Sequence, residues 1–226
     1  MKICVLIPSY NEARAIGILV RALKDRGLTV YVVDDGSIDH TAAIAESNGA
    51  IVIKEKKNKG KGVALREGFK RVLKEDFEAV IILDGDGQHK VDDIDNFLKK
   101  MKETDAGVVI GNRMNDTSLM PYIRIQTNRF MSWLLSKVSG QHVPDSQCGF
   151  RLIKREVLQK IDLKSNKFEI ESELIIKAAS AGFRIESVPV KTVYEDEKSK
   201  INPIKDTIRF IAFMIRTIFS DRRKNV

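Results

Sequence analysis

The sequence Val80-Ile81-Ile82-Leu83-Asp84-Gly85-Asp86-Gly87-Gln88-His89 ends a continuous apolar run in two carboxylates separated by a single glycine. Four consecutive aliphatic residues without polar alternation are typical of a strand covered on both faces, as in a parallel sheet with helices on either side. Ligands of such sheets bind at the carboxyl ends of the strands. We therefore expect a buried strand that delivers Asp84 and Asp86 to a binding site.

These two carboxylates carry like charges, and side chains at positions i and i+2 of an extended chain point the same way. Their repulsion is costly unless a positive group neutralises it. Mg²⁺ and Mn²⁺ prefer one or two carboxylates together with substrate phosphate oxygens. The sequence therefore predicts that Asp84 and Asp86 bind Mg²⁺ or Mn²⁺ together with a phosphate ligand.

Apolar strands alternate with amphipathic helices on both sides of this stretch, up to residue 111. Strands are predicted at 2–7, 29–33, 51–53, 80–83 and 106–111, and helices at 16–26, around 42–45, 63–74 and 92–102. This alternation predicts an α/β fold with a mostly parallel, doubly wound sheet. The later chain is predicted as a loop at 114–122, a helix at 125–138, a turn from 144 that enters a strand by 153, helices at 154–160 and 170–181, a strand pair split by Pro189, and a terminal helix from about 203.

Composition limits the classes of function. The chain has 226 residues, a formal net charge of +8 and two cysteines. This length suits one large domain, and the charge favours an anionic partner. No nucleic-acid-binding signature is present, so no nucleic acid partner is expected. Cys4 and Cys148 form no disulfide framework, no secretory signal is visible, and no apolar run reaches roughly 20 residues, so we expect a cytoplasmic protein.

Four motifs occur in order, each at the end of a predicted strand. They are Ile7-Pro8-Ser9-Tyr10-Asn11-Glu12, Val33-Asp34-Asp35-Gly36-Ser37-Ile38-Asp39-His40-Thr41, Asp84-Gly85-Asp86-Gly87-Gln88-His89 and Gly149-Phe150-Arg151. Together they resemble the family-two glycosyltransferases, and within that family the dolichyl- or polyprenyl-phosphate sugar transferases. The resemblance implies a GT-A fold over residues 1–202, with a nucleotide-sugar half at 1–113 and an acceptor half at 114–202. Residues 203–226 would form a C-terminal amphipathic helix and a basic tail.

The resemblance also implies a metal-dependent, inverting transfer of a sugar from a nucleoside diphosphate sugar to a polyprenyl phosphate. The sugar of the donor would be linked to GDP or UDP. The residues implied to bind it are Pro8, Tyr10, Glu12, Asp34, Asp35, Asp84, Asp86 and Gln88. Tyr10 suits stacking on a base, and Asp34 or Asp35 suits a hydrogen bond from a base edge or ribose. Residues 54–62 and 114–122 would help to select the base and the sugar.

On the acceptor side, the resemblance implies that cations position the acceptor phosphate. The candidates are Arg113, Arg129, Arg151 and Lys200. Asp145 would orient or deprotonate the acceptor. The candidate catalytic residues are therefore Asp145, Arg113 and Arg151. The competing interpretations are that Asp145 is an ordinary turn aspartate, that Arg113 is a surface arginine, and that Arg151 only pairs with Asp145. A phosphate monoester has a second pKa of about 6 and needs little help from a base at neutral pH. Of Glu169, Glu171 and Glu173, one is expected to reach the sugar, unless these acids only begin a helix.

Residues 205–219 are rich in Ile, Phe and Met, and Lys205, Arg209 and Arg216 fall on one stripe. This pattern predicts an in-plane helix that attaches the protein peripherally to the cytoplasmic face of a membrane. A helix docked on the protein's own core fits the same pattern. Two other functions stay open: transfer to a saccharide or protein acceptor, with Asp145 as an essential base, and a non-catalytic nucleotide-binding module recruited to membranes.

Overall fold

The computed structural model describes residues 1–118, 120–191 and 209–216. A single seven-stranded sheet has the order β3-β2-β1-β4-β6-β5-β7. Its strands are β1 Ile3–Ser9, β2 Thr29–Asp34, β3 Ile51–Lys54, β4 Ala79–Ile82, β5 Val108–Asn112, β6 Arg151–Lys154 and β7 Ile185–Pro189. The helices are α1 Ile16–Asp25, α2 Thr41–Ser47, α3 Lys61–Val72, α4 Ile94–Thr104, α5 Tyr122–Ser139, α6 Arg155–Lys160 and α7 Glu169–Ser180, with a 3-10 turn η1 at Val91–Asp93. Residues 209–216 are also helical.

The predicted fold class is confirmed, because every strand pair is parallel except those made by β6, which runs antiparallel to both β4 and β5. Two boundaries differ from the prediction in ways that matter for the site. Helix α3 begins at Lys61 rather than at residue 63, because Gly60 has φ +102° and turns the chain into the helix. Helix α5 begins at Tyr122 rather than at residue 125, directly after Pro121, whose fixed φ suits the start of a helix.

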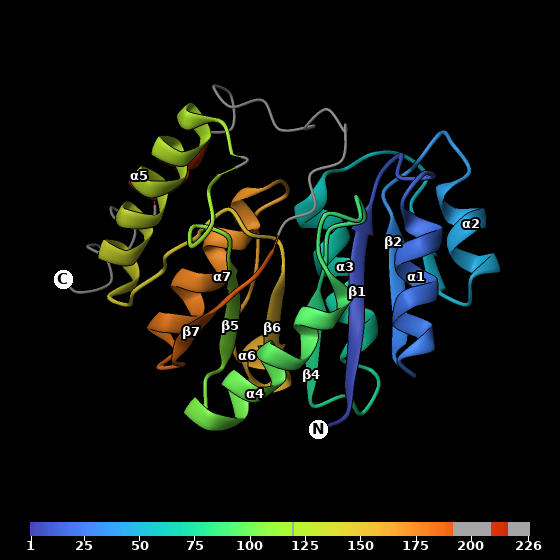
Figure 1. Cartoon of the computed structure of the whole chain (residues 1–226), viewed down its shortest axis with the longest axis horizontal. Helices are drawn as coiled ribbons and strands as arrows, with labels where there is room; N and C mark the ends of the chain where they lie inside the picture. The colour runs from blue at the N-terminus through green and yellow to red at the C-terminus, as the bar shows by residue number, and fades with distance from the viewer. Residues whose placement is uncertain (119, 192–208, 217–226) are drawn as a thin grey trace.

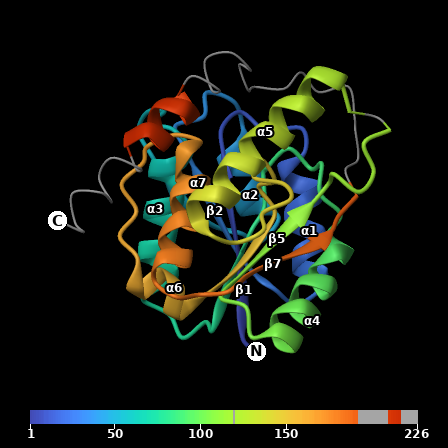
Figure 2. The same cartoon turned by 90° about the vertical axis from the view of Figure 1, so that its left-hand side faces the viewer.

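The helices cover both faces of the sheet. Figure 2 shows α3, α6 and α7 on one side of the strands and α1 and α4 on the other. Because β2 and β3 extend the sheet on one side of β1 while β4 lies on the other, the chain reverses its direction of strand addition at β1. The carboxyl ends of β1 and β4 therefore form the topological switch point at which such sheets bind ligands. Figure 1 shows α5 beyond the end of the sheet towards which β1 points.

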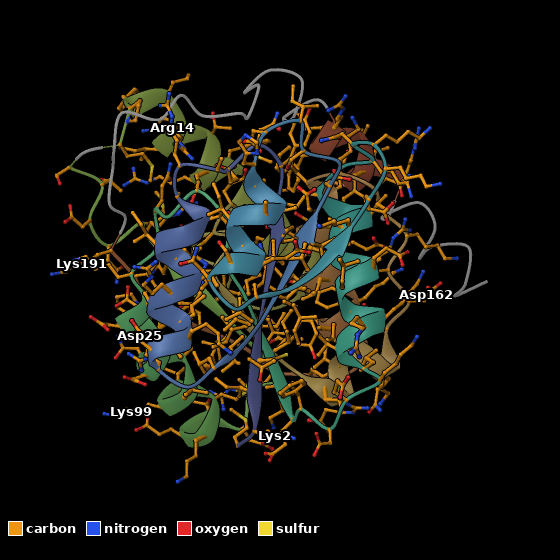
Figure 3. The ribbon with its side chains drawn as sticks, turned by 90° about the vertical axis from the view of Figure 1, so that its right-hand side faces the viewer. Lys2, Arg14, Asp25, Lys99, Asp162 and Lys191 are labelled. Carbon is orange, nitrogen blue, oxygen red and sulfur yellow. The ribbon has the colours of Figure 1, made fainter. Side chains whose placement is uncertain are left out.

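The core explains why the apolar runs become strands. The side chains of β4 and β5 are all buried, and the core continues through β1 and the inner faces of the covering helices. Charged side chains such as Lys2, Lys99 and Asp162 lie at the rim of the molecule (Figure 3). The register pairs Leu6 with Ile82, so the residues that follow β1 and β4 emerge at the same edge of the sheet.

The C-terminal helical turns favour the second interpretation of the sequence. Phe210 and Met214 are buried in the core, and Ile211 and Phe213 pack against it. Lys205 and residues 217–219 of the predicted in-plane helix lie outside the described residues. Within the described ranges, no helix combines the length and apolar character needed to cross a bilayer.

Candidate active site

A cavity of about 480 Å³ opens at the carboxyl edge of the sheet. Its walls come from the segments after β1, β2, β4 and β5, from the first turns of α3 and α7, from α5, and from the helical residues near 209. Both predicted halves of the chain thus contribute to one cavity.

Asp84 and Asp86 both line this cavity, as predicted from the end of the apolar run. Asp86 Oδ1 accepts a hydrogen bond of 3.0 Å from the backbone N–H of Gln88, which also lines the cavity. A Cβ at Gly149 would collide with the carboxylate of Asp84, so the glycine of the Gly149-Phe150-Arg151 motif leaves room for that carboxylate. Gly85 likewise leaves room for Ser9.

Lys61, at the start of α3, neutralises Asp84. Its ammonium forms one ion pair with Asp84 Oδ1 and another, of 2.7 Å, with Glu171 Oε1 at the start of α7. Burial alone would lower the pKa of Lys61, but the attraction of the two carboxylates outweighs it and the pKa is raised. Burial alone would raise the pKa of Asp84, but the Lys61 ammonium holds that pKa below its usual range. Both groups are therefore charged at neutral pH.

The donor set fits a hard divalent cation that is shared with a ligand. Within residues 1–118, 120–191 and 209–216, no three His, Cys, Asp or Glu side chains are grouped closely enough to hold a metal by themselves. Two carboxylates that face one cavity still match Mg²⁺ or Mn²⁺, because these ions commonly take one or two carboxylates and complete their coordination with phosphate oxygens and water. The two carboxylates would therefore leave most of the coordination sphere to water and to oxygens of a bound ligand.

Most of the predicted nucleotide contacts meet here. Pro8, Tyr10, Glu12 and Asp35 line the cavity. Asp35 also organises its wall, because its carboxylate accepts hydrogen bonds from the backbone N–H groups of Lys59 at 2.8 Å and Gly60 at 2.7 Å.

Asp34 is the exception among the predicted donor contacts. It is buried at the end of β2 outside the cavity lining, with its Oδ1 facing the backbone N–H of Ser37 at 3.4 Å. In this structure Asp34 is the last residue of β2, and its carboxylate supports the turn that follows.

Arg113 lines the cavity and is held by Asp145. Its Nε and one terminal nitrogen donate to the two oxygens of Asp145 at 2.8 and 2.9 Å, and its backbone N–H donates at 3.1 Å. Asp145 also accepts hydrogen bonds from the Asn128 amide at 2.7 Å and the Gln147 backbone at 3.1 Å. Asp145 is fully buried and does not line the cavity, so its contacts are those of a group that positions Arg113 rather than those of a base.

The other predicted acceptor cations lie elsewhere. Arg151 is 1 % exposed, and its guanidinium donates to the backbone carbonyls of Cys148, Ser146 and Glu171, so it braces the wall behind the cavity. Arg129 is exposed and does not contribute to the lining. Lys200 lies outside the described residues. Arg124 and Arg209 line the cavity instead.

His89, like Lys61 and Arg124, lines the cavity but was not predicted as a site residue from the sequence. His89 is 7 % exposed, packs on Phe150 with ring centroids 5.3 Å apart, and its Nδ1 has no hydrogen-bond partner among the described residues. Burial lowers the pKa of His89 to about 4, so the imidazole is neutral at pH 7.

Of the three glutamates at the start of α7, Glu169 and Glu171 line the cavity, whereas Glu173 accepts hydrogen bonds from the backbone of residues 164 and 165.

Comparison with known proteins agrees with this geometry. Residues 4–162 match glycosyl transferase family 2. The chain is 29 % identical over 217 residues to a UDP-N-acetylglucosamine–dolichyl-phosphate N-acetylglucosaminyltransferase of Methanococcus voltae, with 86 % of each chain covered. It is 31 % identical over 205 residues to a dolichyl-phosphate hexose transferase of Haloferax volcanii, with 89 % of this chain and 87 % of that protein covered.

Among solved structures, the fold matches glucosyl-3-phosphoglycerate synthase of Mycobacterium tuberculosis in complex with Mn²⁺, UDP and glucosyl-3-phosphoglycerate. The TM-score is 0.72 at 18 % identity, over 97 % of this chain and 79 % of that one. The predicted resemblance and the GT-A fold are thus confirmed. The protein belongs to glycosyl transferase family 2 and is a glycosyltransferase.

Proposed function

We propose that this glycosyltransferase moves a sugar, with inversion and with the help of a divalent cation, from a nucleoside diphosphate sugar to a polyprenyl phosphate. The observation that carries the proposal is the division of the cavity. Its lining includes the carboxylates Asp84 and Asp86, while Arg113 and Arg124 provide positive charge from the acceptor half. Relatives named for transfer to dolichyl phosphate support the acceptor class.

On the donor side, Tyr10 stacks on the base and Asp35 holds the loop that faces it. Asp84 and Asp86 would be the residues that hold Mg²⁺ or Mn²⁺. When bound, the cation supplies positive charge to the leaving nucleoside diphosphate. A fold relative crystallised with UDP and Mn²⁺ supports a nucleoside diphosphate and a divalent cation as ligands, and UDP and GDP are both candidate nucleotides.

On the acceptor side, Arg113 and Arg124 orient the phosphate dianion so that one of its oxygens attacks the anomeric carbon of the sugar. The bond between that carbon and the diphosphate oxygen breaks, and its electron pair leaves with the nucleoside diphosphate. Preorganised cations lower the barrier to such a step because they need no rearrangement during the reaction. The Asp145 carboxylate keeps Arg113 in place for this role.

A lipid acceptor requires access from a membrane surface, and α5 provides a suitable face. Tyr122, Ile123, Phe130 and Trp133 are 75, 69, 48 and 57 % exposed. At 3.6 residues per turn these four side chains fall within an arc of about 100°. Arg124 and Met131, on another side of the same helix, line the cavity. We place the enzyme at the cytoplasmic face of a membrane, with α5 in the interface.

Two assays test the proposal. A thermal-shift panel of UDP- and GDP-linked sugars with Mn²⁺ identifies the donor, since a ligand of the folded state raises its stability. The best donor, labelled in its sugar, is then incubated with the protein and a polyprenyl phosphate. We expect the label to move into the organic phase. Label that moves instead to a saccharide or peptide would support the second acceptor class, and donor binding without transfer to any acceptor would leave a binding module.

A further inference from the structure

The Lys61 ammonium is shared between two carboxylates inside the cavity. It pairs with Asp84 Oδ1 and, at 2.7 Å, with Glu171 Oε1, and its side chain is 13 % exposed. The ring of Phe168 lies 5.9 Å from the same nitrogen. Lys61 joins the end of β4 to the start of α7, two segments that belong to different halves of the chain.

Asp84 is also a carboxylate that we assign to the divalent cation, so this inference rests on the proposed function. An ammonium in ion-pair contact with Asp84 Oδ1 occupies space next to any metal bound to that oxygen. The two cations repel each other in a partly buried site, where screening by water is weak. The Lys61 ammonium and the divalent cation therefore compete for Asp84 unless a bound anion, such as a diphosphate, pairs with one of them.

The backbone that carries Lys61 is fixed, whereas its side chain has room to change partners. A Cβ at Gly62 would collide with the backbone of Ser165 and Asn166, so the first turn of α3 packs tightly against that loop. The lysine side chain has four methylene groups and three N–H donors and is able to hold one partner while it changes another. Glu171 and the ring of Phe168 remain within its reach.

We propose that Lys61 is an exchangeable counter-ion of Asp84. In the ligand-free enzyme its ammonium neutralises Asp84. When the cation and the nucleoside diphosphate bind together, the ammonium releases Asp84 to the cation, keeps its contact with Glu171 and donates to a diphosphate oxygen. Cation and nucleoside diphosphate then bind with positive coupling, because the diphosphate removes the ammonium that opposes the cation.

Binding of Mn²⁺ tests this exchange without any acceptor. Mn²⁺ affinity is measured by titration calorimetry on the full chain, alone and with saturating UDP or GDP, whichever stabilises the wild-type protein. We expect the nucleotide to tighten Mn²⁺ binding of the wild type about 5- to 150-fold, the usual range of coupling between sites. In Lys61→Met, Mn²⁺ alone binds about 10-fold tighter than to the wild type and most of the coupling is lost.

Three further variants separate exchange from a general change of charge. Lys61→Arg retains the positive charge and is expected to bind Mn²⁺ alone as weakly as the wild type. Lys167→Met removes a cavity-lining cation that has no ion pair with Asp84, so Mn²⁺ affinity should change far less than in Lys61→Met. Lys59→Met removes an exposed cation that pairs with Glu55 and should leave Mn²⁺ affinity unchanged.

Glu171→Gln keeps the test decisive if Lys61→Met fails to fold. Without Glu171 the ammonium pairs with Asp84 alone, so Mn²⁺ should bind more weakly than in the wild type, and more weakly than in Glu169→Gln, which removes a nearby cavity carboxylate. Unchanged Mn²⁺ affinity in Lys61→Met would overturn the exchange, and if that variant does not fold, unchanged Mn²⁺ affinity in Glu171→Gln would overturn it. Absence of sugar transfer together with the expected Mn²⁺ affinities would instead overturn the proposed acceptor and leave the exchange standing.

Discussion

At the scale of one residue, Asp145 combines complete burial with several hydrogen bonds, which favours a positioning role. Its two oxygens accept bonds from Arg113, Asn128 and the backbone of Gln147. Its pKa is held below the usual range: burial opposes ionisation, but the Arg113 guanidinium and the hydrogen bonds outweigh it. A carboxylate in these surroundings fixes an arginine and has little tendency to take up a proton.

Asp145→Asn should therefore act through Arg113. We expect a loss of about 3 kcal/mol in the free energy of unfolding, because one partner of a buried ion pair is removed. The KM for the lipid phosphate should rise, since Arg113 is no longer fixed. Urea denaturation and steady-state kinetics measure the two effects. Asp116→Asn, at an exposed turn aspartate, should change stability by less than about 0.5 kcal/mol. Lost turnover with unchanged stability and unchanged KM would restore Asp145 as a base.

Glu173 gives a pH-dependent prediction. Its carboxylate accepts hydrogen bonds from the backbone of Lys164 and Ser165 and from Lys177 Nζ at 2.7 Å. Burial opposes ionisation, but these bonds hold the pKa of Glu173 below the ordinary value of 4.5. The carboxylate therefore stabilises the fold above pH 4.5, and this stabilisation is lost as the pH falls through the lowered pKa.

Glu173→Gln should consequently unfold more easily at pH 7, by about 2 kcal/mol, because charged hydrogen bonds are weakened. The difference from the wild type should shrink as the pH falls below 4.5, where the wild-type carboxyl becomes protonated. Urea unfolding at pH 7 and at acidic pH measures this difference in the free energy of unfolding. Glu103→Gln, on the exposed face of α4, is the matched control with little effect at either pH. A difference that grows towards acidic pH would contradict the assigned direction of the pKa.

At the scale of elements, α5 presents two faces of different character. Arg124 and Met131 face the cavity, and Phe130 and Trp133 stack on the outside with centroids 6.2 Å apart. The chain has a single tryptophan, so the fluorescence of Trp133 reports on this face alone.

We expect Trp133 emission to shift to shorter wavelength when anionic phospholipid vesicles are added, because the indole enters the interface. Replacing Ile123 and Phe130 by serine should abolish the shift and reduce co-flotation with the vesicles. Ile18→Ser removes an apolar side chain of similar exposure on α1 and should leave flotation unchanged. Flotation that survives the α5 changes would direct attention to another surface.

At the scale of the whole molecule, features encoded by neighbouring residues could be predicted from the sequence. Contacts between residues distant in sequence could not. Asp84 and Asp86 were predicted because an apolar run and its ending lie within ten residues. Lys61 meets Glu171 across 110 positions of sequence, and no local pattern encodes that meeting. The side of α5 that faces the cavity could also be seen only in the fold. Arg129 was expected at the acceptor phosphate, yet Arg124 lines the cavity. The two side chains lie about 140° apart around the helix, so both cannot face the cavity.

Contact between the two halves gives a further prediction. Gly62 of α3 packs against the backbone of Ser165 and Asn166, where a Cβ has no space. Gly62→Ala should cost about 1–3 kcal/mol of stability from overpacking, although alanine is the better helix former. The variant should also bind nucleoside diphosphate more weakly, since the neighbouring Lys61 is displaced.

Gly140→Ala is the control for this contact. Its Cβ meets no atom within 4 Å, so the variant suffers backbone strain alone, at φ +69°, and should bind nucleotide normally. Thermal unfolding and calorimetry compare the two variants. Equal nucleotide affinity in both would mean that the contact between α3 and residues 165–166 does not support the cavity.

Strand β6 has a consequence for how the protein is made. It lies between β4 and β5, and in the described part of the chain β5 pairs with β6 and β7. A nascent chain that has emerged only to residue 113 therefore presents β4 as an open, wholly apolar edge, and β5 has no neighbour. Such edges template aggregation. The order of synthesis leaves the nucleotide half exposed until the segment around residue 150 arrives, so we expect chaperones to hold the growing chain over this interval.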